Sequence, residues 1–101
     1  MYYKNGNLIL NIYKGTVRVG DKNLNLSMRQ YQLLTLLMVN INKVISHEEI
    51  FETIWGFGFD LHVIYKAKKI LNDRLKFYHS DAKIESVSGW GYLMRDVNAT
   101  N

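Results

Sequence analysis

The sequence predicts a single α+β domain, in which an N-terminal antiparallel β-meander is followed by three helices and a C-terminal β-hairpin. Three observations lead to this prediction. Short segments of alternating apolar residues open the chain, three segments with helical apolar spacing follow, and a Gly-Trp-Gly tip divides two apolar segments near the end. We expect the meander over 1–26, the three-helix core over 27–78, the hairpin over 84–95 and a frayed tail over 96–101.

The composition is that of one small folded domain. The chain has 101 residues, and 48% of them are apolar, enough for one modest core. Because cysteine is absent, disulfides and thiolate metal sites are excluded. No apolar segment approaches the roughly 20 residues needed to cross a bilayer, so we expect no membrane segment in this chain.

The first 26 residues show the two-residue period of strands. Glycine-containing turns at Gly6, Gly15 and Gly20 bound these segments. The pattern predicts a small meander with one apolar face, which the helices must cover. The alternating apolar residues are Leu8, Leu10 and Ile12; Val17 and Val19; Leu24 and Leu26.

Two helices are predicted to begin at serine N-caps. Ser27 with Gln30, and Ser46 with Glu49, have the spacing of a capping box, in which each side chain bonds the backbone of the other residue. Apolar residues at helical spacing follow both serines. The polar segment 40–43 should end the first helix.

The second helix should end at Gly56. The acidic residues at its start, Glu48 and Glu49, lie where the helix dipole favours anions, so capping and solvation explain them better than an acid–base or metal site does. In the connection over 56–60, we expect Phe57 and Phe59 to fold back onto the core; the alternative is an apolar surface for a partner.

The segment 61–78 carries the net charge of the chain. It holds five cations and one anion, so its net charge of +4 equals that of the whole chain and the remainder is neutral. At about 100° per residue one side is apolar and the opposite side is basic. A basic helix on a neutral body indicates a protein that binds a polyanion, the alternative being an ordinary solvated surface. The outer residues are His62, Lys66, Lys69, Asp73 and Lys76, with Tyr65 and Asn72 at one flank.

The order of strands, three helices and a terminal hairpin, with a basic third helix, is that of a winged helix-turn-helix. Three segments resemble the OmpR/PhoB-type DNA-binding domain, also found in CadC/ToxR-like regulators: Leu-Ser-Met-Arg-Gln-Tyr-Gln-Leu-Leu over 26–34, Val-Ile-Ser-His-Glu-Glu-Ile over 44–50 with Ile-Trp-Gly over 54–56, and Gly-Trp-Gly-Tyr over 89–92. The resemblance implies a bacterial transcriptional regulator that binds double-stranded DNA sequence-specifically.

The resemblance also suggests how the DNA would be bound. The helix over 61–78 would enter the major groove, and the wing around Trp90 would lie on the backbone or in the minor groove. Lys66 and Lys69 are candidates for phosphate or guanine contacts, and Asn72 for adenine or phosphate. The full set of expected DNA-binding residues is His62, Tyr65, Lys66, Lys69, Asn72, Lys76, Lys83 and Trp90.

An alternative function is a winged helix that binds protein instead of DNA. It is favoured by the Asn72-Asp73 pair, since the family often has arginine at the position of Asn72, and by a wing that lacks the family's usual basic residues, with Ser88 before Gly89 and Leu93 after Tyr92. An enzyme is not expected, because no catalytic residues, cofactor site or metal site can be assembled. The expected partners are double-stranded DNA, a second copy of the chain on tandem or inverted half-sites, and RNA polymerase through the loop over 56–60. We expect a cytoplasmic location, as a free regulator or as the cytoplasmic head of an inner-membrane regulator.

Overall fold

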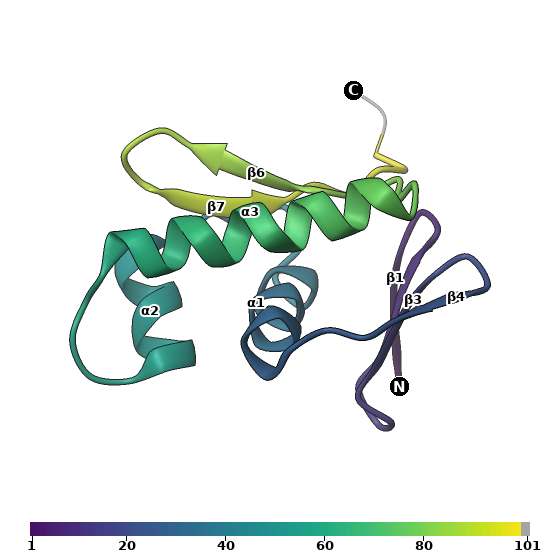
Figure 1. Cartoon of the computed structure of the whole chain (residues 1–101). Coiled ribbons are helices and arrows are strands. Elements are labelled where there is room, and N and C mark those ends of the chain that lie inside the picture. Colours follow the sequence, from purple (N-terminus) through teal and green to yellow (C-terminus); the bar gives the residue numbers. More distant parts are fainter. Residues whose placement is uncertain (100–101) are drawn as a thin grey trace.

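The computed structural model describes residues 1–99 and confirms the predicted α+β architecture (Figure 1). Helix α3 runs across the molecule with the C-terminal hairpin on one side and α1 and α2 on the other, and the meander lies beyond α1 (Figure 1). The elements are β1 (Tyr2–Asn5), β2 (Leu8–Asn11), β3 (Thr16–Val19), β4 (Lys22–Leu24), α1 (Met28–Met38), β5 (Ile45–Ser46), α2 (His47–Trp55), α3 (Leu61–Phe77), β6 (Ile84–Val87) and β7 (Gly91–Met94).

The meander is a four-stranded antiparallel sheet in the order β1-β2-β3-β4. Its register pairs Leu8 with Val19 and Leu10 with Val17, so the predicted apolar face is buried. Strand β1 was not predicted, because its sequence Tyr-Tyr-Lys-Asn does not alternate between apolar and polar residues. Ile12 lies after β2 and is exposed, although we expected it to continue the buried face.

The second sheet joins the hairpin to the helical core in the order β5-β7-β6. The two-residue strand β5, which the sequence did not predict, pairs Ile45 with Tyr92 and Ser46 with Gly91. A Cβ atom at Gly91 would lie 2.0 Å from the carbonyl oxygen of Ile45. This position therefore requires glycine, since any side chain would push β5 and β7 apart.

The two predicted serine N-caps are present, but the reciprocal bond of the predicted capping box forms in α1 and not in α2. Ser27 and Gln30 form the complete capping box of α1, and the Ser46 hydroxyl accepts the backbone N–H of Glu49 at 3.1 Å in α2. Asp60 caps α3, since its carboxylate accepts the backbone N–H of His62 at 3.0 Å. Local sequence therefore sets where each helix begins.

The loop between α2 and α3 differs from expectation at one aromatic residue. Phe57 is fully exposed, so the prediction that it folds back onto the core is wrong. Gly56 and Gly58 on either side of it have positive φ values of 88° and 101°, a path that turns the intervening side chain outward. Phe59 is half-exposed, and its ring lies 5.9 Å from the ring of Phe51.

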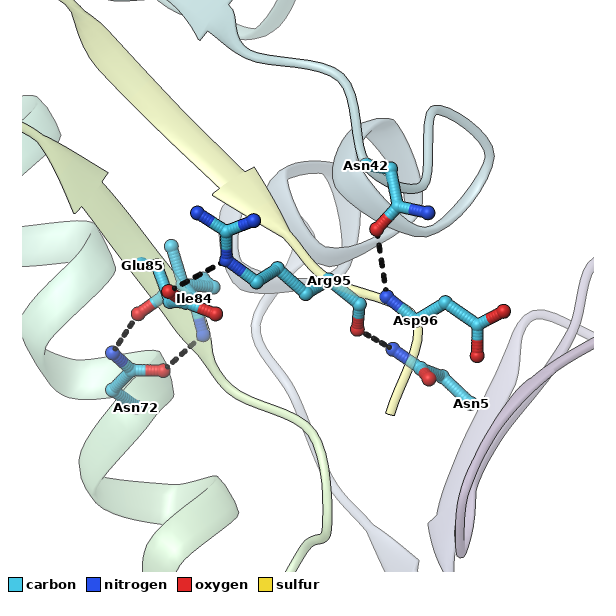
Figure 2. Close-up of polar contacts among 7 residues, drawn as sticks. All are labelled: Asn5, Asn42, Asn72, Ile84, Glu85, Arg95 and Asp96. Carbon is cyan, nitrogen blue, oxygen red and sulfur yellow. Dashed lines mark hydrogen bonds and ion pairs between the residues drawn. The ribbon is translucent and has the colours of Figure 1, made fainter. Parts of the chain in front are cut away.

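Two asparagines tie the meander and the α1–β5 turn to the end of β7, and we call this pair the asparagine clasp (Asn5 and Asn42). The buried Asn5 amide donates to the carbonyl oxygen of Arg95 at 2.8 Å and accepts the N–H of Val97 at 2.9 Å. Asn42 accepts the N–H of Asp96 at 2.9 Å (Figure 2). The tail expected to fray from residue 96 is thus anchored through residue 97, and residues 100–101 lie outside the described residues.

Candidate nucleic-acid interface

The outer face of α3 is open to solvent. Ile64, Leu71 and Leu75 are buried against the core, as the helical period predicted. On the opposite side the charged and polar residues are exposed, so in residues 1–99 the protein's own strands do not cover this face. The exposed residues of this face are His62, Tyr65, Lys66, Lys69, Asp73 and Lys76.

The basic face contains one ion pair. The Lys69 ammonium lies 3.1 Å from the Asp73 carboxylate, and their side chains are 76% and 63% exposed. An exposed pair one turn apart on a helix contributes only about 0.3–0.5 kcal/mol. Lys69 can therefore exchange Asp73 for a phosphate at little cost.

Asn72 has a structural role that the sequence did not indicate. Its amide nitrogen donates to the carbonyl oxygen of Ile84 at 2.8 Å, and its amide oxygen accepts the N–H of Ile84 at 2.8 Å (Figure 2). Because β6 is an edge strand, the side chain occupies the place that a further strand would take. Ile84 engages one N–H and one oxygen lone pair of the Asn72 amide, which leaves one further donor and one lone pair, so the expected contact of Asn72 with adenine or phosphate stays a prediction.

Three other expected residues lie around the wing. Lys76 and Lys83, which are exposed, line one hollow of about 570 Å³ at the foot of the wing, so the structure brings these two cations together. Trp90 lies at the hairpin tip, and its side chain is 60% exposed. More than half of the Trp90 surface is therefore open to solvent and does not pack against the rest of the domain.

A groove of about 590 Å³ separates α3 from the wing, and its floor is aromatic. The buried ring of His47 lies 5.2 Å from the ring of Tyr92 and 5.9 Å from that of Tyr65, both in edge-to-face geometry. The ammonium of Lys68 lies 5.7 Å from the centre of the Tyr92 ring, within the range of a cation–π contact. Burial, followed by the proximity of Tyr65, raises the pKa of Tyr92 to about 12, which keeps its hydroxyl protonated.

Sequence reasoning did not place His47, Lys68 or Tyr92 in the groove. Their side chains come together only through the pairing of β5 with β7 and the packing of α3, which no local pattern encodes. The Gly-Trp-Gly-Tyr segment was the available signal for Tyr92. Among residues 1–99 no group of three or more histidine or acidic side chains could hold a metal ion, and no helix is long and apolar enough to cross a bilayer.

This fold and basic face can be compared with known proteins. The family described as "Transcriptional regulatory protein, C terminal" matches residues 21–94, from the turn before β4 to the end of β7. The chain belongs to this family. Its match includes all three helices and the wing, and so covers the elements that form the open basic face.

Two curated relatives in the family are response regulators. The heme response regulator HssR of Staphylococcus epidermidis is 37% identical over 94 residues, which are 86% of this chain and 40% of that protein. The response regulator ArlR of Staphylococcus haemolyticus is 33% identical over 81 residues, 78% of this chain and 37% of that protein. The chain thus spans about two fifths of the length of these relatives.

Solved structures confirm the winged-helix fold of the OmpR/PhoB type. The DNA-binding domain of RstA from Klebsiella pneumoniae, solved in complex with the RstA box, has a TM-score of 0.83 at 19% identity, over 94% of this chain and 97% of that one. The response regulator DrrB of Thermotoga maritima, an OmpR/PhoB homologue, has a TM-score of 0.78 at 22% identity, over 93% of this chain and 44% of that one. The transcriptional regulatory family and the winged-helix fold are thus established independently.

Proposed function

We propose that this chain binds double-stranded DNA sequence-specifically, as the DNA-binding part of a bacterial transcriptional regulator. The observation that carries the proposal is the open basic face of α3, a helix whose net charge of +4 equals that of the whole chain. An α-helix fits the major groove of a duplex, which is about 12 Å wide. Family membership and the DNA complex of RstA support the same function.

In this arrangement α3 enters the major groove and the wing follows the backbone or minor groove. Lys66 and Lys69 contact phosphates or guanine, and His62 and Tyr65 near the start of the helix reach base edges or phosphates. The contacts at the wing come from Lys76 and Lys83, which bind phosphates from the hollow they share, and from the exposed ring of Trp90, which packs on sugars.

The proposal is tested by binding to a duplex selected from a random library, measured by fluorescence anisotropy at several salt concentrations. The double variant Lys66→Ala/Lys69→Ala should bind more weakly and lower the salt slope by about two units if both lysines contact phosphate. The matched control Lys14→Ala/Lys22→Ala removes the same charge from the exposed edge of the meander and should retain the wild-type slope. If the two double variants showed the same salt slope, Lys66 and Lys69 would not contact phosphate, and the placement of α3 in the interface would be contradicted.

The exposed Phe57 supports an additional contact with protein. It lies in the loop over 56–60 with the half-exposed Phe59, and together they present an apolar surface beside Glu48 and Glu52. We propose RNA polymerase as the partner of this loop. Phe57→Ser should leave duplex binding unchanged and reduce transcription in a purified system; unchanged transcription would contradict the contact.

The alternative function is a winged helix that binds protein instead of DNA. It would be supported if the chain bound a protein through the loop over 56–60 but selected no duplex from the random library.

We further propose that two copies bind tandem or inverted half-sites about one helical turn apart, because a single module buries little DNA surface. Two successive mobility shifts on a two-site duplex, with the second copy binding more tightly, would support this arrangement, and independent binding would contradict it. In this proposal residues 1–101 form a single winged-helix DNA-binding domain, without enzymatic activity. It acts in the cytoplasm, free or as the head of an inner-membrane regulator.

A further inference from the structure

One apolar side chain lies at the border of the basic face of α3. Ile70 is 38% exposed, whereas Ile64, Leu71 and Leu75 of the same helix are buried. It lies one turn after Lys66 and one turn before Asp73, positions that are neighbours on a helix surface. Ile70 therefore belongs to the same surface as the lysines that we propose to meet DNA.

We infer that Ile70 contacts the C5-methyl group of a thymine in the major groove and so selects an A·T base pair at one position of the binding site. The inference rests on the proposed function, and adds a source of sequence preference to it. Thymine C5-methyl is the apolar group that base pairs display in the major groove, and aliphatic side chains pack against it. When the Ile70 side chain packs against the C5-methyl group of thymine, both apolar groups are removed from water.

Helical geometry places Ile70 where such a contact can form. Ile70 lies about 40° around the helix from Lys66 and about 6 Å further along its axis. Because base pairs are spaced by about 3.4 Å, this distance corresponds to about two base pairs. If Lys66 reaches a base edge or phosphate in the groove, Ile70 lies against the groove wall about two base pairs away.

The neighbouring side chains in this part of α3 have other partners. Asn72 bonds the backbone of Ile84, the ammonium of Lys68 lies over the Tyr92 ring, and Asp73 pairs with Lys69. Ile70 has a branched aliphatic surface that is still open to solvent. In this part of α3 we therefore expect the apolar side chain of Ile70, more than these polar side chains, to contact a base directly.

A competing occupant of this surface is a second copy of the chain. Ile70 also borders a shallow hollow of about 330 Å³ lined by Arg74, Phe77 and Tyr78, and the Phe77 side chain is 75% exposed. Phe77 is at the last turn of α3, about 10 Å beyond Ile70, where the helix leaves the groove. The charge of the helix and the position of Ile70 next to Lys66 favour DNA for Ile70 itself.

The test replaces thymine by deoxyuridine, which removes the C5-methyl group and leaves base pairing intact. In the selected duplex, each thymine is replaced in turn, and affinity is measured by fluorescence anisotropy for the wild type and for Ile70→Ala. The wild type should lose about three- to fivefold in affinity at one position, the value of one buried methyl group. Ile70→Ala should bind the two duplexes equally at that position, because the partner of the methyl group is gone.

Two further variants test whether the effect of Ile70→Ala comes from the lost contact and not from a loss of structure. Val44→Ala removes an aliphatic side chain of similar exposure, 39%, outside α3, and should keep the deoxyuridine penalty. Ile70→Val keeps a branched side chain and should keep part of it. Alanine has the highest helix propensity, so Ile70→Ala should preserve α3, which circular dichroism will check.

Each outcome decides the matter. If a duplex is selected but every thymine tolerates deoxyuridine, or if Ile70→Ala retains the full penalty, the inference is wrong and the proposed function stands. If Ile70→Ala changes only self-association in sedimentation, the surface belongs to a second copy and the inference is again wrong. If no duplex is selected at all, both the proposed function and the inference fail.

Discussion

Replacing Asn72 by alanine tests whether this side chain connects the wing to α3. The change removes two hydrogen bonds of 2.8 Å and leaves the N–H and C=O of Ile84 without these partners. Ile84 is only 2% exposed, so water reaches its backbone groups poorly. Leaving a buried backbone group unpaired costs about 1–3 kcal/mol, and partial access of water at an edge strand lowers that figure. We therefore expect Asn72→Ala to lose about 2–4 kcal/mol of stability.

The assay is urea denaturation followed by tryptophan fluorescence and far-ultraviolet circular dichroism. A loss of this size is a large fraction of the about 5–15 kcal/mol that holds a domain folded, so the midpoint should fall clearly. The control is Asn25→Ala, which changes an exposed asparagine outside the helices and strands and should shift the midpoint little. A loss below about 1 kcal/mol for Asn72→Ala would refute a structural role for the amide.

Three further perturbations test other parts of the structure. Gly91→Ala should destabilise the domain by about 3 kcal/mol or more, because the new methyl group would overlap the carbonyl oxygen of Ile45. Asn5→Ala should cost about 2 kcal/mol by opening the asparagine clasp, and should speed amide exchange at the end of β7. Because burial raises the pKa of Tyr92 from 10.0 to about 12, the folded state holds this proton more tightly than the unfolded state. The resulting stability is complete below pH 10 and is lost as pH rises to about 12, a decrease of about 2–3 kcal/mol that Tyr92→Phe should abolish.

Distinct results would contradict each of these expectations. Wild-type stability of Gly91→Ala would mean that β5 and β7 can separate at no cost. Unchanged exchange rates in Asn5→Ala would mean that the clasp does not hold the end of β7. Equal loss of stability above pH 10 in the wild type and in Tyr92→Phe would mean that Tyr92 is not the group that titrates.

Much of the fold could be predicted because its determinants are local. The helix starts follow from Ser27, Ser46 and Asp60, each of which bonds a backbone N–H two or three residues ahead. The open face of α3 follows from the helical period alone. Such interactions involve neighbours in sequence, so a single chain displays them directly.

The parts that escaped prediction depend on contacts between distant segments. Strand β5 has two residues and exists only because β7 lies beside it. The amide of Asn72 looked free in the sequence, but its partner lies twelve residues later across the turn into the wing. Phe57 was expected inside because phenylalanine is usually buried, whereas two glycines with positive φ values turn it outward.

The wing is fastened to the helices at two separate points, through β5 at the start of α2 and through Asn72 in the middle of α3. The angle between α3 and the wing is therefore fixed in the free protein, so in the proposed binding mode little ordering of the protein would oppose association with a duplex. A rigid binder of this kind leaves the adjustment of shape to the nucleic acid. Easily deformed base steps between the two points of contact should consequently be preferred, even at base pairs that no side chain reaches.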